Sequence, residues 1–108
     1  MMEKLIITCA ISGAEVMKAH NPHVPYTISE MVREAKGAVE AGASVIHVHA
    51  RFDDGTPTQD KARYEAIINA IRQACPSVII QPSTGGAVGM TRDERLAVTD
   101  LHPEMAPL

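Results

Sequence analysis

The chain has 108 residues, of which 45% are hydrophobic and 21% charged, and this balance is typical of one globular domain. The 13 acidic residues outnumber the 10 Lys and Arg, and a net charge of −3 offers no basic surface to nucleic acid. The apolar content excludes a disordered chain, and no apolar run approaches the roughly 18 residues that a membrane helix needs. We therefore expect neither a nucleic-acid partner nor a membrane partner.

The cysteines and the N-terminus bear on the cellular compartment. Cys9 and Cys75 are too few for a small secreted domain held together by disulfides, so we expect both to be reduced, buried thiols. The apolar run at residues 5–11 is short for a signal peptide and is interrupted by Thr8. We expect a cytoplasmic protein.

The first predicted element is a strand at residues 4–11. This segment is rich in β-branched residues and apolar on both faces, as in a parallel sheet that is covered on both sides. A loop containing glycine and proline follows over residues 12–26. Thr27 and Glu30 then form a capping box, and apolar residues at helical spacing predict a helix that ends at Gly42.

A second strand is predicted at residues 44–50, and a loop over residues 51–58 leads to a second helix. This helix should begin near Gln59 or Asp60 and end before Pro76. Its expected buried face consists of residues at helical spacing: Tyr64, Ile67, Ile68, Ile71 and Cys75.

The third predicted strand, residues 78–81, leads into a Gly-rich loop at residues 82–90. Thr91 and Glu94 form a second capping box, which opens a shorter third helix. Residues 105–108 resemble the start of a fourth strand.

Strands that alternate with helices predict an α/β fold with a parallel sheet. Two architectures fit this order. One is the N-terminal β-α-β-α-β-α portion of a (β/α)8 TIM barrel, a fold of about 250 residues, in which residues 1–108 form a single partial domain. The alternative is a small flavodoxin-like doubly wound domain that is complete in itself. The beginning of a fourth strand favours the barrel.

In both architectures, ligands bind at the C-terminal ends of the strands. His47 and His49 lie two residues apart at the end of the second predicted strand, so their imidazoles face the same side and could share a metal ion. A catalytic zinc site usually has three protein ligands, and no third ligand is evident. The alternative is a polar pair that is hydrogen-bonded to its neighbours at a barrel mouth.

The loops supply further candidates. The Gly-rich loop at residues 82–90 offers backbone N–H groups and hydroxyls to an anionic oxygen, although a tight turn that requires glycine explains it equally well. Its sequence matches neither the P-loop nor the dinucleotide fingerprint. Glu15 could bind a cation or an amine, or be a solvated loop acid. Arg51 could anchor a carboxylate or form an ordinary ion pair.

Together these motifs resemble the β-keto acid cleavage enzyme family. The resemblance covers essentially the whole chain, in order and with natural spacing. Its motifs lie at residues 12–15, 25–27, 41–51, 54–58, 81–86 and 102–106. Residues 81–91 are most similar to the family members that act on 3-keto-5-aminohexanoate in lysine fermentation.

The resemblance implies a homo-oligomeric zinc enzyme on a (β/α)8 barrel of more than twice this length. Such an enzyme transfers an acyl group between a β-keto acid and acetyl-CoA, and releases acetoacetate and an acyl-CoA, here an aminoacyl-CoA. His47 and His49 match the family's zinc-binding histidines, and Glu15 matches the acid that contacts the substrate's amino group. Ser83 and Gly86 match residues of the substrate's carboxylate and carbonyl region.

Other contacts are expected around the same site. Thr84 and Gly85 could hold developing charge on an oxyanion, and Arg51 a carboxylate. The family's third zinc ligand and its acid–base aspartate belong to later strands, so we expect this chain to be inactive by itself. The alternatives are a non-catalytic α/β domain that binds an anionic ligand at the Gly-rich loop, and a fragment that completes a barrel with another chain.

Overall fold

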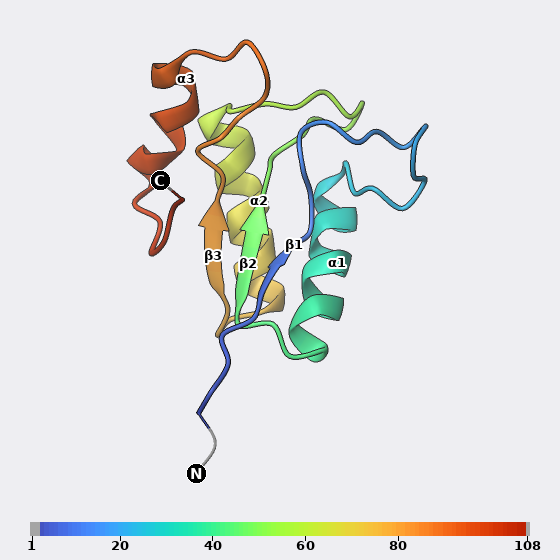
Figure 1. The fold of residues 1–108 in the computed structure, drawn as a ribbon, viewed down its shortest axis with the longest axis vertical. Coiled ribbons are helices and arrows are strands. Elements are labelled where there is room, and N and C mark those ends of the chain that lie inside the picture. The colour runs from blue at the N-terminus through green and yellow to red at the C-terminus, as the bar shows by residue number, and fades with distance from the viewer. Residues whose placement is uncertain (1–2, 108) are drawn as a thin grey trace.

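Strands and helices alternate along the computed structural model, which describes residues 3–107 (Figure 1). The strands are β1 (Thr8–Ala10), β2 (Val45–Val48) and β3 (Ile79–Pro82). They form a parallel sheet in the order β1-β2-β3. The helices are α1 (Ile28–Glu40), α2 (Lys61–Ala74), α3 (Arg92–Leu96) and the 3-10 helix η1 (Ala97–Leu101).

The helical segments that contribute to the core pack on one face of the sheet. Ile46 and Val48 of β2 and Ile80 of β3 lie in a single apolar core with buried residues of α1 and α2. Val98 of η1 belongs to the same core and is fully buried. Right-handed crossovers between strands that are added in one direction place successive helices on the same face. In Figure 1, α2 accordingly lies behind β2 and β3.

The strand order decides between the two predicted architectures. In a flavodoxin-like sheet the first strand lies between the second and third, at the point where the order reverses. Here β2 is the middle strand and pairs with both β1 and β3. The flavodoxin-like alternative is therefore wrong, and the fold is an α/β unit in which each new strand is added on the same side of the sheet.

The predicted starts of the three helices are confirmed, and α1 ends at Glu40, just before the predicted Gly42. The Thr27 hydroxyl accepts the Glu30 N–H, and the Glu30 carboxylate accepts the Thr27 N–H in return. Thr91 and Glu94 make the same reciprocal pair at the start of α3. Asp60 caps α2 through the N–H of Arg63. Each cap satisfies backbone donors that the first turn of a helix leaves free.

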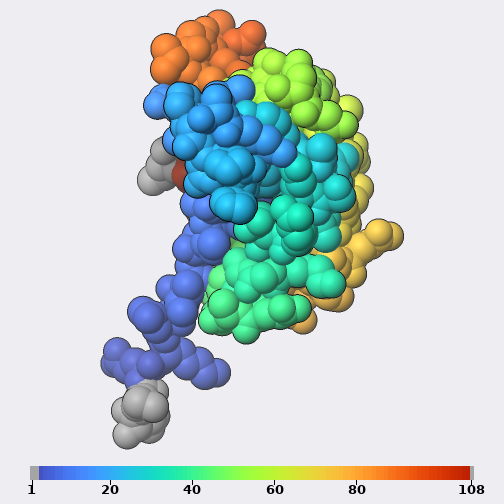
Figure 2. Space-filling view, turned by 90° about the vertical axis from the view of Figure 1, so that its right-hand side faces the viewer, coloured from blue at the N-terminus to red at the C-terminus, as the bar shows by residue number. Residues whose placement is uncertain are grey.

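The first strand is much shorter than predicted. Only Thr8–Ala10 forms β1, and the segment before it is exposed, with Leu5 at 83% and Ile6 at 75%. In the space-filling view, this segment projects from the body of the molecule (Figure 2). Because β1 is an edge strand, the described chain provides no neighbour on its outer side to cover these side chains.

The predicted fourth strand lies partly outside the described residues, because it includes Leu108. Residues 105–107 form no strand. The Pro107 carbonyl instead accepts a 2.8 Å hydrogen bond from the Thr84 hydroxyl, which holds it beside the loop that follows β3. Across residues 3–107, no helix combines the length and the apolar character needed to cross a bilayer.

Gly55 provides a test of how the loop at residues 51–58 packs against the loop at residues 12–26. Its φ of +94° belongs to the left-handed region, and a Cβ there would overlap the ring of Tyr26. We expect Gly55→Ala to lower the free energy of unfolding of the complete protein by about 2 kcal/mol, because both the φ angle and the ring position are disturbed. Urea unfolding followed by circular dichroism measures this change.

Gly37→Ala is the matched control. Gly37 lies inside α1, and a Cβ there would meet nothing within 4 Å. Alanine is the better helix former, so we expect this variant to be more stable than the parent by about 0.5–1 kcal/mol. If Gly55→Ala and Gly37→Ala changed the free energy of unfolding equally, the backbone conformation at position 55 would not require glycine.

Candidate functional site

The histidine pair lies at the C-terminal end of β2, on the sheet face opposite the helices. His47 is the third residue of β2, and His49 follows the strand's last residue, Val48. Their ring centroids are 5.2 Å apart and their planes meet at 74°. Both side chains are half-buried. The alternation of β2 thus places both rings on one face, as the sequence predicts.

Gln81 orients the first of these rings. It is the register partner of His47 on β3, and its Oε1 lies 2.8 Å from His47 Nδ1. Because an amide oxygen only accepts, this contact calls for a proton on Nδ1, and in the neutral tautomer that carries it there Nε2 keeps its lone pair. Metal-binding histidines are commonly held in this way by a partner on the other ring nitrogen. Gln81 was not among the predicted site residues, although its strand position two residues before Ser83 was a signal for it.

Ser12 holds the main chain of the second histidine. Its hydroxyl donates to the His49 carbonyl at 2.8 Å and accepts the His49 N–H at 2.9 Å. These two bonds continue the pairing of β1 with β2 beyond the last strand residues. The end of β2 is therefore fixed from both sides, by Ser12 from the β1 side and by Gln81 from β3.

His49 is neutral near neutral pH. Burial lowers its pKa below the ordinary value of 6.5, and the nearby His47 and Arg51 lower it further. A neutral imidazole has a free lone pair, which is the form that binds a metal ion. Over residues 3–107, however, no group of three or more His, Cys, Asp or Glu side chains converges to hold a metal. A three-ligand site would need another ligand beyond these two histidines.

Part of the Gly-rich loop is committed to its own turn. Ser83 is 2% exposed. Its hydroxyl accepts the Gly85 N–H at 3.0 Å, and its carbonyl accepts a hydrogen bond from the Gln59 side chain. Gly86 has a φ of +62°, and a Cβ there would approach the Arg95 side chain to 2.9 Å. The interpretation that glycine is needed for a tight turn is confirmed at this position.

A hollow of about 560 Å³ joins the histidine pair to the Gly-rich loop. Its lining residues are His47, His49, Ser83, Thr84, Gly85, Arg92, Arg95, Leu96 and Pro107. The lining has two arginines and no carboxylate, which favours an anionic ligand. Arg92 and Arg95 were not predicted as site residues, because sequence position alone does not show that α3 borders the end of β2.

Glu15 and Arg51 do not line this hollow. Glu15 is exposed in the loop after β1. Arg51 is fully buried, and its guanidinium donates to the carbonyls of Gly13, Val16 and Gly55 at 2.7–3.2 Å. It forms no ion pair with any residue in the range 3–107. Backbone contacts thus take the place of the predicted ion pair of Arg51 within the described residues, and the predicted contact with a ligand carboxylate stays a prediction.

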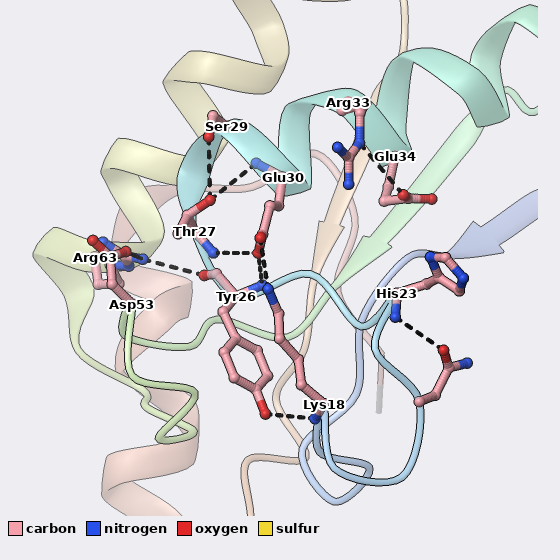
Figure 3. A network of polar contacts seen from close by, with 11 residues as sticks. Lys18, His23, Tyr26, Thr27, Ser29, Glu30, Arg33, Glu34, Asp53 and Arg63 are labelled. Atoms are coloured by element: carbon pink, nitrogen blue, oxygen red, sulfur yellow. Dashed lines mark hydrogen bonds and ion pairs between the residues drawn. The ribbon is translucent and has the colours of Figure 1, made fainter.

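The loop that carries Glu15 is tied to α1 by a polar network (Figure 3). Lys18 Nζ lies 2.6 Å from the Glu30 carboxylate, and the Lys18 N–H donates to the Tyr26 hydroxyl at 2.7 Å. The other Glu30 oxygen accepts the N–H groups of Tyr26 and Thr27. These contacts, first Lys18 and then the two N–H groups, lower the Glu30 pKa to about 2.

Comparison with known proteins identifies relatives over the full chain. The family model described as "beta-keto acid cleavage enzyme" matches residues 4–108. The chain is 70% identical over 108 residues to the "3-keto-5-aminohexanoate cleavage enzyme" of Fusobacterium nucleatum, covering 100% of this chain and 40% of the relative. Identity to the protein of that name from Acetoanaerobium sticklandii is 68% over 107 residues, covering 99% of this chain and 39% of the relative.

A more distant relative carries a different name. The "3-oxoadipate:acetyl-CoA acetyltransferase" of Cupriavidus necator is 43% identical over 108 residues, which cover 100% of this chain and 38% of the relative. The chain thus spans about 40% of the length of these three curated relatives.

The ionisation of Glu30 allows a pH-dependent test of the polar network that ties the Glu15 loop to α1. Its folded-state pKa of about 2 lies below the ordinary value of 4.5, so the stability it contributes is present above 4.5 and is lost as pH falls toward 2. We expect Glu30→Gln to lower the free energy of unfolding of the complete protein by about 1 kcal/mol at neutral pH, because the capping box and the Lys18 pair are broken.

The difference between Glu30→Gln and the parent should shrink as pH is lowered from about 5 to about 3. Urea titrations at several pH values measure it. Glu34→Gln changes a partly exposed α1 residue whose carboxylate lies 3.9 Å from Arg33, and it should leave stability almost unchanged at every pH. If the difference in free energy of unfolding between Glu30→Gln and the parent did not change with pH, the ionised Glu30 carboxylate would not be the source of this stability.

Proposed function

The chain belongs to the β-keto acid cleavage enzyme family, and from this membership we propose that its complete protein transfers an acyl group between a β-keto acid and acetyl-CoA. The products would be acetoacetate and a new acyl-CoA. One observation carries the proposal: the histidine pair, with Gln81 on its first ring, faces a cation-lined hollow on the open side of the sheet. The names of the relatives support the same reaction class.

The proposed architecture of the complete protein is a (β/α)8 barrel. Strands that are added in one direction, with their helices sharing one core, support this proposal. The face with His47 and Gln81 would then line the barrel interior, and the strand ends would form its mouth. Such a protein would be a homo-oligomer, as the family resemblance implies, and its few cysteines favour the cytoplasm.

His47 and His49 would hold a zinc ion together with a carboxylate from a later part of the protein. The donor set fits zinc, because two imidazoles stand on one face and the contact with Gln81 uses Nδ1 of His47, not Nε2. When bound, zinc supplies a Lewis acid that polarises the keto oxygen of the substrate. The acid–base group of the reaction would also come from a later part of the protein.

The residues of this chain would bind and orient the substrate. Arg92 and Arg95 would attract its carboxylate into the hollow. The Ser83 hydroxyl already accepts the Gly85 N–H, so its own proton is available to a ligand oxygen. The backbone N–H groups of Thr84 and Gly86 would hold charge that develops on the carbonyl oxygen, whereas the Gly85 N–H is already bonded to the Ser83 hydroxyl.

The substrate we propose is 3-keto-5-aminohexanoate, cleaved in lysine fermentation to acetoacetate and an aminoacyl-CoA. The relatives at 70% and 68% identity bear the name of this substrate, whereas the relative at 43% is named for 3-oxoadipate. Glu15 would select the substrate's ammonium group, because an exposed carboxylate offers a complementary charge.

The reaction is tested with the complete protein. Purified protein is incubated with acetyl-CoA and 3-keto-5-aminohexanoate, and acetoacetate is measured together with bound zinc. We expect acetoacetate to form and zinc to be retained. His47→Ala should abolish both, because one of the two histidine ligands is lost. The absence of acetoacetate from the parent protein would contradict the proposed reaction.

Two further variants sharpen the zinc assignment. Gln81→Leu should weaken zinc binding about 10- to 100-fold, because the orienting bond to His47 is removed. His23→Ala, at an exposed loop position, should retain zinc at the parent's level. Normal zinc content in His47→Ala would overturn the ligand assignment even if the enzyme were active.

A further inference from the structure

Arg51 is a buried cation whose donors are directed at main-chain atoms. Its relative exposure is 0%, and it sits two residues after His49. Nε donates to the Gly13 carbonyl at 2.8 Å, and Nη2 donates to the Val16 carbonyl at 2.7 Å. A buried charge is costly unless it is well hydrogen-bonded, so this side chain is held firmly in place by its partners.

The two carbonyls that Arg51 binds lie on either side of Glu15. Gly13 stands two residues before it and Val16 directly after it. The main chain around Glu15 is thus fixed from both sides, while the carboxylate itself stays exposed. A third bond, from Nη1 to the Gly55 carbonyl at 3.2 Å, joins the loop after β2 to the same guanidinium.

The Tyr26 ring packs against the Arg51 guanidinium. The Arg51 guanidinium carbon lies 5.3 Å from the centre of the Tyr26 ring, within cation–π range, and the ring rests against Gly55. The Tyr26 hydroxyl accepts the Lys18 N–H, which fixes the Glu15 loop at a second point. A lysine at position 51 would provide a single ammonium in place of the planar fork and could not reproduce the three carbonyl contacts.

We propose that Arg51 is a positioning residue that sets the location of Glu15 relative to the histidine pair. His49 and Arg51 follow the same strand end, and the Arg51 guanidinium binds the Glu15 loop. The position of the Glu15 loop is therefore fixed relative to the histidine pair. The proposal rests on the proposed function, in which Glu15 binds the substrate's ammonium group. Arg51 thereby determines selectivity for an amino-bearing β-keto acid without touching the substrate.

The test uses Arg51→Lys in the complete protein, with two substrates. These are 3-keto-5-aminohexanoate and 3-oxohexanoate, which has the same carbon chain but no amino group. We expect KM for the amino substrate to rise about tenfold, because the bond to Glu15 is misaligned. KM for 3-oxohexanoate and kcat for both substrates should stay within about twofold of the parent.

A double-mutant cycle identifies Glu15 as the group through which Arg51 acts. Glu15→Gln should raise KM for the amino substrate by itself, and adding Arg51→Lys should then have little further effect. Tyr26→Phe, which keeps the ring and removes the hydroxyl contact to Lys18, should produce a smaller rise of the same kind. Arg33→Lys, the same substitution at an exposed α1 position, should change neither KM.

Hydrogen exchange provides a readout that does not depend on activity. Arg51→Lys should speed amide exchange in residues 12–26 and leave α2 at the parent's rate. Unchanged exchange, or an equal KM rise for both substrates, would overturn the positioning role. If the parent cleaves neither keto acid, the proposed function fails, and the exchange experiment still decides whether Arg51 holds the loop. If Arg51→Lys does not fold, Tyr26→Phe decides by the same two measurements.

Discussion

The two-residue repeat of β2 is the constraint on which the rest of the structure depends. Ile46 and Val48 enter the apolar core with the helices, so the side chains between them must point away from that core. His47 and His49 therefore face the open side together. A register shift of one residue would bury both imidazoles against α1 and α2 and expose the two aliphatic residues instead. Because burying the imidazoles and exposing the aliphatic side chains would raise the free energy of the fold, the histidine pair stays on the open face.

Around this pair, the chain separates groups that hold the site from groups that remain available to a ligand. Ser12, Gln81 and Arg51 are engaged with the main chain or with an imidazole ring, and each joins one element to the next. No hydrogen bond within residues 3–107 engages His47 Nε2 or the Glu15 carboxylate. Such preorganisation lets a site bind its ligand without first ordering its own side chains.

Features set by local sequence were predictable, whereas features set by distant neighbours were not. Both capping boxes and the buried face of α2 follow from residues within a few positions of one another. The length of β1 depends on what lies beside an edge strand, so its pattern alone overstated it. The role of Arg51 depends on carbonyls 35 to 38 residues away, for which side-chain type gives no signal. The same is true of Gln81, whose partner His47 lies 34 residues earlier.

We propose that the open face of β2 is a zinc-binding face. Crystals of the complete protein, measured just above and just below the zinc absorption edge, would test this proposal. We expect an anomalous peak about 2.0–2.1 Å from nitrogen atoms of both His47 and His49, with Gln81 still bonded to His47 Nδ1. A zinc peak elsewhere in the protein, or none in protein shown to cleave its β-keto acid, would contradict the proposed zinc site.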